Sequence, residues 1–388
     1  MRKLILEDRK AILDDLLKRI TETLQLNDSR RKLVEQRYAA VSSFIEQSSG
    51  LFKDADIYAQ GSYRIGTTVR PREGEEYDLD FVVQVDKDWK TIPFSYVYDE
   101  FKKLMHTNGN WGSLVIEKPR CIRLNYADEF HMDIIPTCTE NRFGDKNRIM
   151  VPDRSVHNWG ISNPEGYALW FESKYIAQKG IYLSDFYPGM EIRAAQDLPK
   201  DDPNYLKQPI QHAVQLIKRY RDVYFEGREK WAPSSIVLTT LAGQLYNREN
   251  SIAETIHNII QRFESSVNTE RQYFRQFHIS NPVLPQEIFT REWETNPLLF
   301  QEFMKFIKSL HELWQKLQTL QGHQLSEEMK KAFGTGAFES AYKTQGEFIE
   351  QMRNEGRTGI SKISGMAGAF AGSHIQKDRP NTFHGGCQ

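Results

Sequence analysis

The sequence QGSYRIGTTVRPREGEEYDLDFVVQV occupies residues 60–85. Its last part, YDLDFVVQV, is rich in β-branched and aromatic residues, which predicts a β-strand. Asp78 and Asp80 stand two positions apart in this strand. Because side chains alternate between the two faces of a sheet, we expect both carboxylates on one face and Leu79 and Phe81 in the core.

Two carboxylates on one face repel each other, and a divalent cation would relieve that repulsion. Oxygen-only ligation suits Mg²⁺, which keeps several waters and takes further oxygens from substrate phosphates. The alternative is that Asp78 and Asp80 form the solvated face of a half-buried strand, which is the commoner origin of an isolated Asp-x-Asp pair. The sequence on either side of the pair favours the metal site.

A Gly-Ser pair precedes this strand. Gly61 lets the backbone approach a ligand without a Cβ atom in the way, and Ser62 can offer its hydroxyl and N–H groups to a phosphate. Such a pair is common in ordinary turns, so it carries weight only together with the carboxylates.

A third carboxylate follows the pair. Asp133 lies in the apolar strand candidate FHMDIIP, residues 130–136, where a carboxylate is costly unless it is paired or bound to a metal. The chain after Asp80 is long enough to form a helix and two strands before it returns beside the first strand. Three carboxylates can hold two cations, one activating an attacking hydroxyl and one neutralising a triphosphate and its departing pyrophosphate. We expect the nearby His131 to be a hydrogen-bonded structural histidine rather than a ligand.

Hydrophobic spacing predicts an α+β fold with two lobes, a mixed-sheet half and a helical C-terminal half. Two amphipathic helices come first, the second beginning at the cap residues Asn27, Asp28 and Ser29. Short strand candidates follow, and helical periodicity then dominates. We assign residues 1–50 to helices that bridge the lobes, 51–165 to the catalytic core, 166–355 to a helical domain that closes the cleft, and 356–388 to a flexible tail.

Composition limits the classes of function. The chain has 388 residues, 39% of them hydrophobic, and a net charge of −1, which disfavours binding of long nucleic acid. No apolar run approaches the roughly 18 residues needed to cross a membrane, and the charged N-terminus does not resemble a secretion signal, so we expect a cytoplasmic protein. Only Cys121, Cys138 and Cys387 are present, without disulfide or zinc-site spacing.

Together, the Gly-Ser pair, the Asp-x-Asp pair and the later Asp resemble the nucleotidyltransferase superfamily, which has the polymerase-β-like fold. The sequence around these motifs, together with the later segments QHAVQLIKRYRDVYF and APSSIVLTTLAG, is similar to that of the bacterial relatives of cyclic GMP-AMP synthase called CD-NTases. The resemblance covers about residues 55–245. It implies a template-independent enzyme that joins NTPs, with ATP or GTP as the expected substrates, into a cyclic di- or trinucleotide second messenger for anti-phage signalling.

The resemblance also implies roles for individual residues. Gly61 and Ser62 would hold the donor triphosphate, and Gln60 would line the same pocket. Asp78, Asp80 and Asp133 would bind two Mg²⁺ ions, for which Mn²⁺ can substitute.

In the helical half, Lys218 and either Ser234 or Ser235 match positions that contact the donor phosphates in similar enzymes. Two ordinary explanations stay open for these residues. Lys218, Arg219 and Arg221 can form a solvated basic face, and Ser234 can be only a helix N-cap.

Two alternatives to the cyclic product remain, a nucleotidyltransferase acting on RNA or protein hydroxyls and a catalytically silent nucleotide-binding module. For the C-terminal tail, the resemblance implies a ubiquitin-transfer-like enzyme as a partner, with Gly385 and Gly386 near the attachment point. The two residues after Gly386 argue against that, and an unstructured end without a role is the alternative.

Overall fold

The computed structural model describes residues 2–70, 72, 77–126, 130–140, 144–176, 206–272 and 277–354, and three short strands between 358 and 377. Two compact units divide the chain. One unit is Leu24–His311, and the other combines Met1–Thr23 with Glu312–Gln388.

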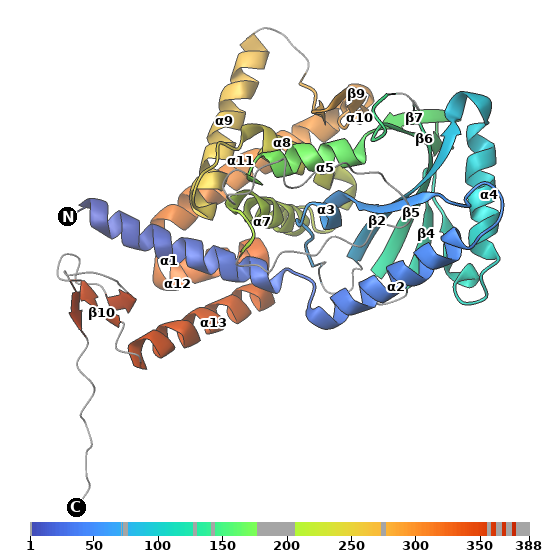
Figure 1. The fold of residues 1–388 in the computed structure, drawn as a ribbon. Helices are drawn as coiled ribbons and strands as arrows, with labels where there is room; N and C mark the ends of the chain where they lie inside the picture. Colours follow the sequence, from blue (N-terminus) through green and yellow to red (C-terminus); the bar gives the residue numbers. More distant parts are fainter. Residues whose placement is uncertain are drawn as a thin grey trace, which may run out of the picture. The chain divides into compact units, whose positions relative to one another are not determined.

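A mixed sheet forms one side of the Leu24–His311 unit, and helices form the other (Figure 1). The strand order is β1-β2-β5-β4-β3, and β6 pairs with both β5 and β7. The central neighbours β2 and β5 run parallel, whereas the other pairs in the sheet are antiparallel. The strands are β1 (Asp56–Gln60), β2 (Tyr77–Asp88), β3 (Val115–Glu117), β4 (Ile122–Tyr126), β5 (Phe130–Thr139), β6 (Ile149–Asp153) and β7 (Asn158–Ser162).

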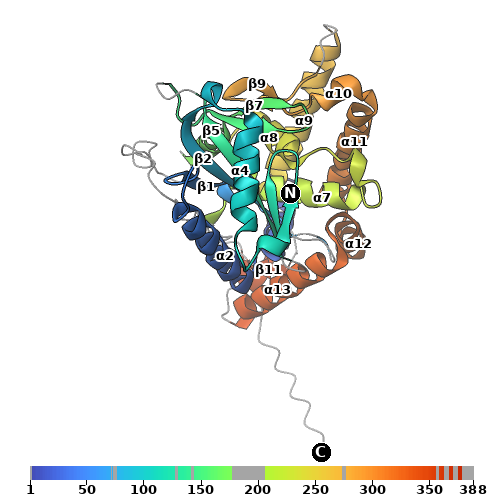
Figure 2. The same cartoon turned by 90° about the vertical axis from the view of Figure 1, so that its right-hand side faces the viewer.

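Helices α2 (Asp28–Glu46) and α4 (Phe94–His106) cover one face of this sheet (Figure 2). As predicted, α2 begins at the Asn27 cap, whose side chain accepts a hydrogen bond from the Arg30 N–H. Leu79 and Phe81 are buried in the core beneath the two helices, as the alternation along β2 predicted. Asp78 and Asp80 therefore point to the opposite face.

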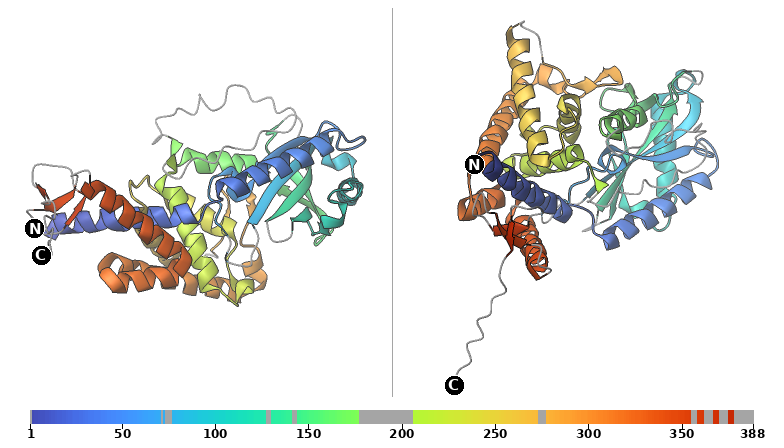
Figure 3. Two further views of the ribbon diagram at one scale, coloured as in Figure 1. Left: turned by 90° about the horizontal axis from the view of Figure 1, so that it is seen from below. Right: turned by 60° about the vertical axis from the view of Figure 1, so that its left-hand side comes forward.

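The opposite face meets the helical half of the same unit. A second core joins Ile65 to residues of α5, α7, α8 and α9, and α5 lies between α8 and the sheet (Figure 3). A β8–β9 hairpin interrupts the predicted run of helices. The four-residue α3 (Gly61–Arg64) follows β1 and contacts β1, β2 and α5. The elements of the helical half are α5 (Pro164–Ser173), α7 (Pro209–Tyr224), α8 (Ser235–Leu245), α9 (Ile252–Gln272), β8 (Ser280–Asn281), β9 (Leu284–Ile288), α10 (Glu292–Thr295) and α11 (Pro297–Thr319), which runs across the unit boundary.

The other unit contains α1 (Arg2–Thr23), α12 (Gly322–Phe333) and α13 (Thr335–Asn354). The Gln345 side chain on α13 donates hydrogen bonds to the Ile12 carbonyl (3.3 Å) and the Asp15 carboxylate (2.8 Å) on α1. Because α1 and α2 belong to different units, the bridging role of residues 1–50 stays a prediction. None of the described helices is both long and apolar enough to span a membrane.

The C-terminal tail is described only in part. Strands β10 (Thr358–Ser361), β11 (Ala367–Ala369) and β12 (Ile375–Lys377) form a small sheet in the order β11-β10-β12, which the sequence analysis did not anticipate. Cys387, Gly385 and Gly386 lie outside the described residues.

Candidate active site

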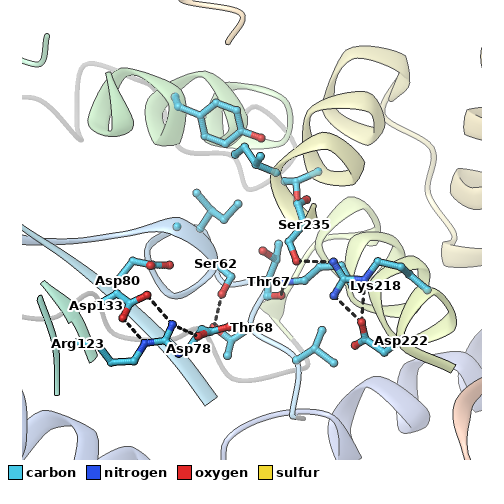
Figure 4. Close-up of a pocket in the computed structure, with 17 residues that line it drawn as sticks. Ser62, Thr67, Thr68, Asp78, Asp80, Arg123, Asp133, Lys218, Asp222 and Ser235 are labelled. Atoms are coloured by element: carbon cyan, nitrogen blue, oxygen red, sulfur yellow. Dashed lines mark hydrogen bonds and ion pairs between the residues drawn. The ribbon is translucent and has the colours of Figure 1, made fainter. Parts of the chain in front are cut away.

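The three candidate carboxylates line one pocket. The parallel register of β2 and β5 places Asp80 opposite Asp133, and Asp78 opposite His131. Asp78, Asp80 and Asp133 all face a cavity of about 410 Å³ between the sheet and the helical half of the same unit (Figure 4). The structure thus brings together residues that are far apart in the sequence.

The turn after β1 closes against these carboxylates. Gly61 has a φ of +63°, and a Cβ atom at this position would lie 2.6 Å from Asp80 Oδ2. A glycine is therefore required both for the left-handed backbone and for the close approach of the turn to Asp80. Ser62 follows on the cavity wall, with its hydroxyl 3.5 Å from that of Thr68.

One face of α7 holds the segment that follows this turn. Four buried side chains at positions i, i+4, i+7 and i+8 donate hydrogen bonds to backbone carbonyls of residues 65–70. That spacing puts them on one side of a helix. The pairs are Gln211 with Ile65 (3.1 Å), Gln215 with Thr68 (2.8 Å), Lys218 with Thr67 (3.0 Å) and Arg219 with Arg70 (2.8 Å).

Lys218 and Arg219 are only 6% and 7% exposed, so a solvated basic face is the wrong explanation for them. Lys218 also lines the cavity. Burial, with the nearby Arg221 charge, lowers the pKa of the Lys218 ammonium to about 8. An anion in the cavity would oppose both effects and favour the charged form.

Ser234 and Ser235, at the start of α8, differ in whether they line the cavity. Ser235 lines the cavity, and its hydroxyl accepts a hydrogen bond from Arg221 Nη1 at 2.9 Å. Ser234 is the N-cap residue of α8 but makes no capping hydrogen bond through its side chain. Neither Ser234 nor Gln60, at the end of β1, is among the described residues that line the cavity.

The carboxylates differ in their partners. Asp133 accepts two hydrogen bonds from Arg123, at 2.7 Å and 2.8 Å, and Asp78 interacts with His131 Nε2 and lies 3.5 Å from Arg123 Nη2. Partial desolvation opposes ionisation of Asp78, whose side chain is 66% exposed, but the His131 hydrogen bond and the His131 and Arg123 charges outweigh it and lower the pKa of Asp78. The prediction of a hydrogen-bonded His131 is confirmed, with a candidate metal ligand as the partner.

The side chain of Asp80 makes no hydrogen bond or ion pair with any other residue in the described part of the chain, although its backbone pairs with the neighbouring strands. Burial and the charges of Asp133 and Asp78 raise the pKa of Asp80 to about 7. A half-buried carboxylate that is repelled by two others, and whose side chain has no partner among the described residues, is the environment that a divalent cation would stabilise.

The donor chemistry of the pocket therefore fits Mg²⁺, which prefers carboxylate oxygens. The three carboxylates do not have the geometry of ligands around a bound metal. Arg123 holds both oxygens of Asp133, and within the described ranges no three His, Cys, Asp or Glu side chains are arranged as ligands of one ion.

Comparison with known proteins decides the family. Residues 11–174 match the Second Messenger Oligonucleotide or Dinucleotide Synthetase domain (SMODS). A c-di-GMP synthase from Roseivirga ehrenbergii is 32% identical over 390 residues, which cover 98% of this chain and 100% of that protein. The chain belongs to the bacterial CD-NTases. It is a nucleotidyltransferase of the kind that synthesises cyclic oligonucleotides.

Solved structures confirm the predicted fold of this CD-NTase. The Bradyrhizobium diazoefficiens CD-NTase CdnG, solved in complex with GTP, superposes with a TM-score of 0.68 at 23% identity over 86% of this chain and 99% of that one. The Vibrio cholerae cyclic AMP-GMP synthase DncV gives a TM-score of 0.53 at 16% identity over 87% and 90% of the two chains.

Sequence reasoning missed several residues that line the pocket of the CD-NTase. Arg123 carried a detectable signal, because it stands between the buried Ile122 and Leu124 on an alternating strand and so shares a face with the carboxylates. The others depend on how the helical half folds back and gave no local signal. They include Ile65, Thr67, Thr68, Val69, Tyr167, Asp222, Ile236 and Thr239.

The raised pKa predicts a stability effect at Asp80. Its native pKa of about 7 lies above the ordinary value of 3.8, so the folded state keeps a proton that the unfolded chain releases, and stability falls as the pH rises between these values. We expect Asp80→Asn to raise the melting temperature by about 5 °C at pH 8 without divalent cations, and the difference to vanish near pH 4. Melting curves measure this, and a variant less stable than the parent at pH 8 would refute it.

Proposed function

We propose that this CD-NTase joins two nucleoside triphosphates, at least one of them GTP, into a cyclic dinucleotide. The observation that carries the proposal is the pocket in which three carboxylates face the Gly61-Ser62 turn and Lys218. The full-length similarity to a c-di-GMP synthase supports a guanine nucleotide, and a second relative, 23% identical over 91% of this chain, is the cyclic dinucleotide synthase CdnG of Bradyrhizobium diazoefficiens.

In this proposal the donor triphosphate lies against Gly61, Ser62, Lys218 and Ser235. The backbone turn offers close approach, and the buried Lys218 offers a positive charge that a phosphate stabilises. The α7 hydrogen bonds hold residues 65–70, which follow the turn, in place before the nucleotide arrives. Contacts from Gln60 and Ser234 stay predictions.

Asp78, Asp80 and Asp133 are the residues that would hold two Mg²⁺ ions. When bound, Mg²⁺ neutralises the triphosphate and the departing pyrophosphate and makes the ribose hydroxyl more acidic. The protein orients a 2′ or 3′ hydroxyl of one nucleotide toward the α-phosphorus of the other, so that the P–O bond to pyrophosphate breaks as the new P–O bond forms and the hydroxyl proton passes to water. The linear product then turns within the pocket, and the same step closes the ring.

The proposal also includes a cellular role and a cellular location. Family membership supports a role in bacterial anti-phage signalling. A cytoplasmic location fits the nucleotide substrates. Attachment of the tail by a ubiquitin-transfer-like enzyme stays a prediction, because the terminal residues lie outside the described part of the chain.

Incubation of the purified protein with four labelled NTPs and Mg²⁺ tests this function. We expect a small phosphatase-resistant product with the mass of a cyclic dinucleotide that contains guanine. A product of linear, phosphatase-sensitive oligonucleotides, or label found only in RNA or protein, would contradict the proposal. Label that stays entirely in NTPs would indicate a silent nucleotide-binding module.

A further inference from the structure

Arg123 occupies the candidate metal site from the neighbouring strand. It stands opposite Asp133 in the antiparallel register of β4 and β5. Its Nε lies 2.7 Å from Asp133 Oδ1 and its Nη2 lies 2.8 Å from Oδ2. This bidentate geometry is the strongest form of guanidinium–carboxylate pairing, and both side chains are mostly buried, 23% and 17% exposed.

The same guanidinium also reaches a second carboxylate. Nη2 lies 3.5 Å from Asp78 Oδ1, so Arg123 bridges two of the three candidate ligands (Figure 4). A divalent cation bound to Asp78 and Asp133 would therefore lie a few ångströms from a permanent positive charge. Two positive charges at that distance repel each other, and the partial burial of Arg123 and Asp133 limits how far water screens the repulsion.

We propose that Arg123 is an internal counter-cation that competes with the divalent metal for Asp133 and Asp78, and that it is displaced when metal and nucleotide bind together. The inference rests on the proposed function, because it takes these carboxylates as the metal ligands. Without nucleotide, the guanidinium neutralises the acidic pair and weakens metal binding.

Nucleotide binding changes the competition between Arg123 and the metal ion for the two carboxylates, because the triphosphate is negatively charged. Arg123 lines the same cavity as Ser62 and Lys218, where the triphosphate is placed. A bound triphosphate gives the displaced guanidinium a new anionic partner, so each ligand favours the other. Such coupling is reciprocal, and it prevents the pocket from holding a metal ion that has no substrate beside it.

Binding of Mn²⁺ to the purified full chain tests the proposal without measuring turnover. Electron paramagnetic resonance of free Mn²⁺ gives the affinity with and without a nonhydrolysable GTP analogue. We expect Arg123→Gln to bind Mn²⁺ about tenfold more tightly than the parent without nucleotide, and to lose most of the enhancement that the analogue gives the parent. Arg123→Lys keeps the charge and should remain closer to the parent.

A matched control is Arg154→Gln, which removes another arginine ion pair, to Glu117 at 2.8 Å, outside this pocket. It should leave the Mn²⁺ affinity unchanged, and melting curves verify that each variant is folded. Equal or weaker Mn²⁺ binding by folded Arg123→Gln, in a parent that does bind Mn²⁺ with the analogue, would overturn this inference alone. Absence of Mn²⁺ binding in every protein and condition would overturn the proposed metal site as well.

Discussion

Replacing Asp78 and Asp80 together by asparagine should lower the rate of cyclic product formation by at least about 10³-fold. Metal ions contribute several kcal/mol to such reactions, and each 1.36 kcal/mol is a factor of ten in rate. Asp78 and Asp80 are two of the three candidate metal-binding carboxylates in the pocket, and asparagine keeps their shape while it removes their charge. Initial rates at saturating NTP and Mg²⁺ measure the effect.

The same strand provides a matched control. Asp86 and Asp88 have the same spacing on β2, and neither lines the pocket. Asp86→Asn with Asp88→Asn makes the same change in net charge and should retain the parent rate. If the Asp78 and Asp80 double variant also retains the parent rate, these residues do not bind the catalytic metals.

Replacing Arg64 should have the second large effect, because it connects the Gly61-Ser62 turn to helix α5. Its guanidinium donates to both oxygens of Glu165, at 2.8 Å and 3.3 Å, and also pairs with Glu172. All three side chains are mostly buried, at 18%, 9% and 13% exposure. Arg64→Ala would leave two buried carboxylates unpaired, which costs about 3–5 kcal/mol.

We therefore expect Arg64→Ala to lower the melting temperature by about 10 °C and to raise the KM for NTPs about tenfold or more. Adding Glu165→Gln and Glu172→Gln should restore much of the stability, since no buried charge then lacks a partner, but it should not restore the KM. Recovery of the melting temperature without recovery of the KM would show that Arg64 positions the turn in addition to stabilising the fold.

Arg154→Ala is the matched control for Arg64, because its ion pair with Glu117 is 44% and 40% exposed. Its loss should cost at most about 1 kcal/mol. A normal KM for NTPs in folded Arg64→Ala would show that the ion pairs do not position the turn.

The fold was predictable where local pattern and burial agree. Alternation along β2 placed Leu79 in the core and Asp78 on the other face, because that strand is long and one of its sides is apolar and buried from Tyr77 to Val85. Strand β7 escaped prediction because NWGIS contains asparagine and glycine and none of its residues is buried. Its pairing with β6, rather than its own composition, makes it a strand.

For the site, the sequence predicted which residues could bind a metal ion, but not which side chains those residues contact. Asp133 was recognisable because a carboxylate in an apolar strand needs a partner. That the partner is Arg123 follows from strand register, which the sequence does not reveal. Lys218 lines the pocket, and its predicted contact with the donor phosphates stays a prediction. Its hydrogen bond to the Thr67 carbonyl depends on how α7 packs on the segment after the turn.

Anomalous diffraction from crystals of the full chain, grown with Mn²⁺ and a nonhydrolysable GTP analogue, tests the central claim most directly. We predict manganese peaks about 2 Å from carboxylate oxygens of Asp78, Asp80 and Asp133, with the triphosphate beside Ser62. A bound nucleotide with no manganese at these three carboxylates would contradict the account.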